Sequence, residues 1–253
     1  MDTLNSAILR WATLFAVILN VLFNYSYVKI FSQASMGEVS ARYPSLFTPS
    51  GYAFSIWGLI YISFIFYCII QLQRSRLPKK LYNQVSLPLL LSNLLAGLWI
   101  WVYTNEMLLL SVVIILALLF LSIEMFIVTG KAARQSKHSW WLQFPFSLFF
   151  GWLSVAFLAN LSVFVAEQQG KGNPMLAFIM LAIAGLAAII VSFRFKNAVY
   201  PAVIAWATIA IASARKNDHT DIAYGALAIS IVSIIMVIIA VLQLRNLKRQ
   251  REQ

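Results

Sequence analysis

Charged residues are scarce in this chain of 253 residues. Asp, Glu, Lys and Arg together make up 11% of the sequence, whereas a soluble domain carries roughly 25%. Hydrophobic residues reach 61% and occur in long uninterrupted runs. A water-soluble fold of this size cannot bury so much apolar surface. The composition therefore excludes a soluble protein and predicts a membrane protein.

Cysteine and histidine are nearly missing as well. Cys68 is the single cysteine, which excludes an intrachain disulfide and a cysteine-based metal cluster. The two histidines, His138 and His219, lie in predicted loops without the spacing of a metal or phosphate motif. Asp218 and Asp221 flank His219, a cluster more typical of a solvated turn than of a metal site. We therefore predict no catalytic residues and no metal ligands, and hydrolytic or metal-dependent enzyme chemistry has little support.

The apolar runs predict helices that cross a membrane. Each run is continuous and near the roughly 20 residues that one span requires, whereas barrel strands would alternate in polarity. We predict an all-α, polytopic transmembrane helix bundle with eight spans. The predicted spans cover residues 8–31, 51–73, 82–103, 107–128, 140–166, 174–193, 198–214 and 222–244.

Basic residues gather at the ends of these spans, as topology signals do. With both termini on the inner side, 14 of the 19 Lys and Arg residues lie inside and five outside. The rule that basic loops stay inside therefore predicts cytoplasmic termini, and we expect a bacterial plasma membrane. The same clusters account for the net charge of +11. Membrane lipids are thus the expected partners, and nucleic acid is not.

One acidic residue lies well inside a predicted span. Glu124 stands about a turn and a half before the inner end of the fourth span. It either pairs with Lys131 or Arg134 near the membrane interface, or it serves as a proton or polar site in an internal cavity. The first alternative is the more ordinary one, and both stay open at the level of sequence.

Four asparagines also lie inside the spans. Asn20 and Asn24 share one face of the first span, while Asn93 and Asn160 lie in the third and the fifth. An amide in hydrocarbon is costly unless it is paired. These residues therefore either join helices through hydrogen bonds or form a polar patch in a ligand cavity.

Tryptophan is frequent within the spans. An inward-facing indole can stack on a flat apolar ligand and donate its N–H. Because Trp99 and Trp101 are two residues apart on a helix, they point to opposite sides, so at most one can face a given cavity. Tryptophans well within the predicted spans include Trp57, Trp99, Trp101 and Trp152.

Two stretches carry a family resemblance. Residues 47–61 read FTPSGYAFSIWGLIY and resemble the signature of the tryptophan-rich sensory protein family, which includes the translocator proteins (TspO/MBR). Residues 152–160 read WLSVAFLAN and are similar to the last helix of that family, where Trp and Asn stand eight apart. Ser50 replaces the second proline of the family loop, and Tyr52 replaces its helix tryptophan.

The resemblance covers about residues 8–166 and implies a five-helix core at residues 1–170. Residues 171–253 would add three spans and a basic tail. The resemblance also implies that the loop of residues 32–50 covers a pocket for flat apolar ligands, among them porphyrin or haem. The implied ligand-binding residues are Pro49, Tyr52, Phe54, Trp57, Tyr61, Asn93, Trp99, Trp152, Ala156 and Asn160.

The leading hypothesis is thus a membrane binding or sensor protein for a hydrophobic, tetrapyrrole-like or lipid-like ligand. A small-solute transporter of the inner membrane is the alternative, with Glu124 and the asparagines along its route, although no internal repeat is visible. An enzyme acting on a bound pigment has the least support. Small residues such as Gly185 and Gly225 suit close helix packing, so the last three spans are expected to serve packing or homo-oligomer formation.

Overall fold

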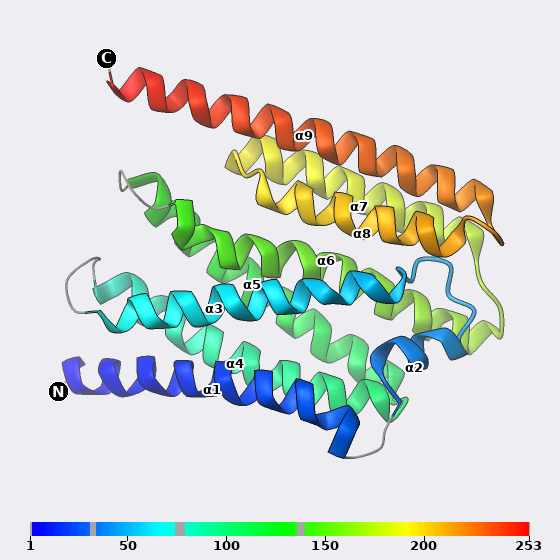
Figure 1. The fold of residues 1–253 in the computed structure, drawn as a ribbon, viewed down its shortest axis with the longest axis horizontal. Helices are drawn as coiled ribbons and strands as arrows, with labels where there is room; N and C mark the ends of the chain where they lie inside the picture. Colours follow the sequence, from blue (N-terminus) through cyan, green and yellow to red (C-terminus); the bar gives the residue numbers. More distant parts are fainter. Residues whose placement is uncertain (1, 31–33, 74–78, 136–139, 253) are drawn as a thin grey trace. The chain divides into compact units, whose positions relative to one another are not determined.

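The structure is a computed structural model that describes residues 2–30, 34–73, 79–135 and 140–252. The described chain is almost entirely helical (Figure 1). It divides into two compact units. Unit 1 comprises Met1–Val39 and Ser55–Leu153, and unit 2 comprises Ser40–Phe54 and Ser154–Gln253.

Unit 1 is built from long apolar helices. Helix α1 packs along α3 and α4, and α4 packs along α5. Helix α6 contributes its first part, up to Leu153, to this unit. The helices are α1 (Asp2–Ile30), α3 (Ile56–Leu72), α4 (Lys79–Thr104), α5 (Leu108–Gln135) and α6 (Trp140–Gln169).

Unit 2 combines the last three long helices with the segment that precedes α3. Helices α7, α8 and α9 pack against one another and lie side by side in Figure 1. The unit also holds the second part of α6 and most of the 3-10 helix η1. The remaining elements are α2 (Met36–Arg42), η1 (Gly51–Ser55), α7 (Pro174–Phe195), α8 (Val199–Arg215) and α9 (Thr220–Glu252).

The helix lengths confirm a polytopic membrane bundle. Within the described ranges, seven helical segments are long and apolar enough to cross a membrane. Helix α8, with 17 residues, is a shorter apolar helix at the place of the predicted short seventh span. Among the helices that extend past the predicted spans, α5 reaches Gln135 and α9 reaches Glu252. Lys and Arg favour helix, so these helices continue beyond their apolar runs.

A short helix, α2, lies within residues 32–50, which were predicted to form a loop. The backbone N–H of Glu38 donates to Ser35 Oγ at 3.2 Å, and the Ser35 N–H donates to Glu38 Oε2 at 2.6 Å. This reciprocal pair is a capping box, and it starts α2 at Met36. The Ser-x-x-Glu pattern was visible in the sequence, so α2 was predictable.

Side-chain caps also set the boundaries of α7 and α8. Asn173 Oδ1 accepts the Leu176 N–H at 3.0 Å, and Pro174 occupies the first turn, where its missing donor costs nothing. Lys196 takes a left-handed conformation (φ 51°) that ends α7. Asn197 Oδ1 then accepts the Tyr200 N–H at 2.9 Å and starts α8. The left-handed Lys196 and the cap by Asn197 explain why α7 and α8 are separate helices.

Candidate functional site

An aromatic cluster connects α3 and α6 in unit 1. The rings of Trp57 and Tyr61 are stacked with centroids 5.4 Å apart, and Phe149 meets Trp57 edge-on at 6.2 Å. Phe64 contacts both Phe149 and Phe146, at 5.2 and 5.7 Å. Tyr61 and Phe64 are buried, whereas Trp57 is only half-buried. The cluster therefore ends in an indole that the protein covers incompletely.

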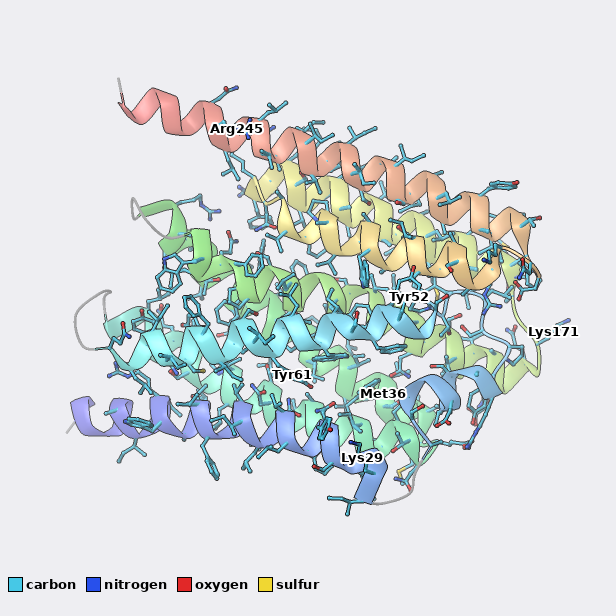
Figure 2. All side chains as sticks on the ribbon, viewed as in Figure 1. Lys29, Met36, Tyr52, Tyr61, Lys171 and Arg245 are labelled. Atoms are coloured by element: carbon cyan, nitrogen blue, oxygen red, sulfur yellow. The ribbon has the colours of Figure 1, made fainter. Side chains whose placement is uncertain are left out.

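A polar network begins one helical turn from Trp57. Tyr61 lies on the side of α3 toward α1 (Figure 2), where its hydroxyl forms a hydrogen bond with the Asn20 side chain. Asn20 Nδ2 donates to Asn93 Oδ1 at 3.1 Å, and Asn24 Nδ2 donates to Asn20 Oδ1 at 2.8 Å. The network thus joins α1, α3 and α4. For Asn20 and Asn93, the structure shows an interhelical hydrogen bond, which was one of the two alternatives predicted from the sequence.

The other tryptophans of unit 1 occupy different surroundings. Trp152 on α6 is only 1% exposed and belongs to the packed core. Trp99 is buried and stacks on Tyr103 of the same helix, with centroids 5.0 Å apart. Trp101 is 46% exposed. The prediction that Trp99 and Trp101 point to opposite sides of α4 is confirmed.

The predicted ligand residues divide between the two units. Unit 1 holds Trp57, Tyr61, Asn93, Trp99 and Trp152. Unit 2 holds Pro49, Tyr52, Phe54, Ala156 and Asn160. Of these residues, the contacts within unit 1 bring Trp57, Tyr61 and Asn93 into one continuous set. A ligand role for each of the ten residues stays a prediction.

Glu124 lies on the outer surface of α5. Its side chain is exposed, whereas its neighbours Met125 and Phe126 are buried. Lys131 and Arg134 are exposed on the same helix. The described structure therefore gives the carboxylate no enclosed surroundings, and its role as a proton or polar site stays a prediction.

Sequence reasoning missed one residue that contacts a candidate. Trp206 of α8 donates its indole N–H to the Ala53 carbonyl oxygen at 3.2 Å and meets the Tyr52 ring edge-on at 5.4 Å. Trp206 is the only tryptophan after Trp152. Its isolation in helices poor in aromatic residues was the available signal.

These features define a polytopic helical membrane protein with a partly open aromatic surface beside a buried amide network. The profile of the family described as TSPO-like protein matches residues 10–239. The chain therefore belongs to the TSPO-like protein family. The match includes α7, α8 and most of α9, so it is longer than the resemblance noted above. Comparisons with curated proteins and with solved structures find no significant match.

The amide network leads to a stability prediction. Asn93→Leu is expected to lower the free energy of unfolding by about 0.6–1.7 kcal/mol, the range for interhelical hydrogen bonds in membrane proteins. The reason is that Asn20 Nδ2 loses its acceptor on α4. Unfolding by SDS in mixed micelles measures the change. Asn83→Leu, at an exposed position of the same helix, is the control. Equal stability of the two variants would contradict a contribution from the network.

Proposed function

We propose that this chain is an integral membrane binding or sensor protein for a flat hydrophobic ligand of tetrapyrrole type. The observation that carries the proposal is the incompletely covered Trp57 at the end of the aromatic cluster. The ligand would stack on this indole, because aromatic rings favour offset or edge contacts with other rings. Membership of the TSPO-like protein family supports the same class of ligand.

The polar network adds a means of orienting such a ligand. Ligand sites are mostly apolar, with a few polar groups that fix orientation. Here the Tyr61 hydroxyl and the Asn20 and Asn93 amides are held in place by their mutual hydrogen bonds. They would meet a polar substituent of the ligand, while the aromatic rings meet its flat face. Coverage of the ligand by residues 32–50 stays a prediction from the resemblance.

Transport of a small solute has no comparable support. That hypothesis needs a polar route through the bundle that includes Glu124 and the asparagines. The exposed position of Glu124 on α5 does not favour such a route. We therefore retain binding as the proposed function.

A titration with protoporphyrin IX tests the proposal. The purified protein in detergent is expected to shift the Soret band of the porphyrin in a saturable manner. Trp57→Leu removes one ring contact, worth about 1 kcal/mol or more with its buried area, so the Kd is expected to rise about tenfold. Trp101→Leu alters an exposed tryptophan of α4 and should leave the Kd unchanged.

Two outcomes would refute the assignment. One is the absence of saturable binding by the folded wild-type protein. The other is an equal Kd for the Trp57→Leu and Trp101→Leu variants. Size-exclusion chromatography of each variant in detergent shows that a loss of binding does not come from unfolding.

A further inference from the structure

Residues 44–54 form the segment before α3, and three contacts within unit 2 attach this segment to α8. The Ser50 backbone N–H donates to the Ala210 carbonyl oxygen at 3.1 Å. Trp206 Nε1 donates to the Ala53 carbonyl oxygen at 3.2 Å. The Tyr52 ring, on the side of η1 toward α8 (Figure 2), meets the Trp206 ring at 80° with centroids 5.4 Å apart. Two backbone groups and one side chain of the segment thus contact α8.

The beginning of the same segment is held elsewhere in unit 2. Ser45 Oγ donates to Ser162 Oγ of α6 at 2.9 Å, and Thr48 Oγ1 donates to Ser45 Oγ at 2.8 Å. Gly172, in the connection between α6 and α7, lies so close to the Pro44 carbonyl oxygen that a Cβ there would be 2.5 Å away. This end of the segment is therefore attached to α6 and to the connection that follows it.

The two attachments differ in burial. Phe47 and Ser45, at the first attachment, are 0% and 2% exposed. At the second, Tyr52 and Trp206 are 46% and 38% exposed, while Ala53, whose carbonyl oxygen accepts the indole N–H, is 0% exposed. Separation of exposed rings uncovers little additional surface, whereas withdrawal of Phe47 would open the core of the unit. The first attachment is therefore the firmer one, and the contact between the Tyr52 and Trp206 rings is the part that separates at the lower cost.

We propose that Trp206 is the positioning residue of residues 50–54. Its indole N–H and its ring hold this part of the segment on α8, and separation of Trp206 from Tyr52 and Ala53 releases it. Ser45 and Ser162 keep the other end in place. Tyr52 then serves to attach the segment to α8. Release of residues 50–54 is then expected to speed the dissociation of the ligand. This consequence rests on the proposed function, because the ligand itself is a proposal.

Hydrogen–deuterium exchange of the full-length protein in detergent tests the attachment without any ligand. Trp206→Leu removes a hydrogen bond and a ring contact, so exchange in residues 50–54 is expected to accelerate by about tenfold or more. Trp206→Phe keeps a ring but loses the N–H donor, so a smaller acceleration is expected. Ile209→Ala changes a 40% exposed residue of the same helix and should leave exchange in this segment unchanged.

Unchanged exchange in residues 50–54 of a folded Trp206→Leu variant would overturn the proposal. A second measurement follows the dissociation of protoporphyrin IX, which is expected to be faster from Trp206→Leu than from Ile209→Ala. Equal dissociation rates alongside faster exchange would overturn the link to ligand release. If the wild-type protein binds no porphyrin while exchange responds to Trp206→Leu, the proposed function fails and the attachment by Trp206 stands.

Discussion

Trp152→Ala is expected to lower the free energy of unfolding by about 3–5 kcal/mol, the usual cost of truncating a fully buried aromatic side chain. Among the side chains that the structure describes, Trp152 is the largest that is fully buried, with 1% exposure. Its removal leaves a cavity in the interior of the bundle, where van der Waals packing is the main force between membrane helices. Unfolding by SDS in mixed micelles measures the loss.

Trp101→Ala provides the matched control for this prediction. The Trp101 side chain is 46% exposed, so its truncation opens no interior cavity. The expected change is within about 0.5–1 kcal/mol. Comparable losses for Trp152→Ala and Trp101→Ala would contradict the burial that separates them. Because truncation of the buried Trp152 is expected to destabilise the fold, a variant of the half-buried Trp57 is the better test of ligand binding.

Gly172→Val is expected to displace the beginning of the segment that precedes α3. A Cβ at residue 172 would lie 2.5 Å from the Pro44 carbonyl oxygen and 2.7 Å from Leu46 Cγ. The carbonyl belongs to the backbone and cannot rotate away alone, so the two chain segments must separate. Overpacking of this kind costs about 1–3 kcal/mol. We expect faster hydrogen–deuterium exchange in residues 45–48 and lower stability.

Gly58→Ala is the control for Gly172→Val. A Cβ at residue 58 would meet no heavy atom within 4 Å. Because alanine is the better helix former by about 1 kcal/mol, this change should preserve or raise stability. Unaltered exchange in residues 45–48 of Gly172→Val would show that the close approach does not hold in the folded protein.

The spans were predictable because each apolar run is long and continuous. Hydropathy and the distribution of Lys and Arg were sufficient to predict two separate helices at residues 174–193 and 198–214, where the structure has α7 (Pro174–Phe195) and α8 (Val199–Arg215). The capping box of Ser35 and Glu38 also gave a local signal for α2. These features depend on neighbouring residues alone, and sequence patterns report such local effects well.

The pairing of distant residues was not predictable in the same way. Asn20 and Asn93 are 73 positions apart, and Trp206 and Ala53 are 153 apart. Such pairs depend on how two helices are rotated about their axes, and packing sets that rotation. For a related reason, the sequence did not reveal whether Glu124 faces the interior of the bundle or its surface. Helix α5 is apolar on all sides around it, so periodicity does not reveal which face is buried.

We propose above that a flat hydrophobic ligand binds against Trp57 and Tyr61 of α3. Photo-crosslinking tests it most directly, using a porphyrin that carries a diazirine group, with the protein in liposomes and labelled residues identified by mass spectrometry. We predict labelling within residues 56–72 that is abolished by excess protoporphyrin IX and reduced by Trp57→Leu. Labelling confined to exposed side chains such as Phe120 and Ile231, without competition by protoporphyrin IX, would contradict the claim.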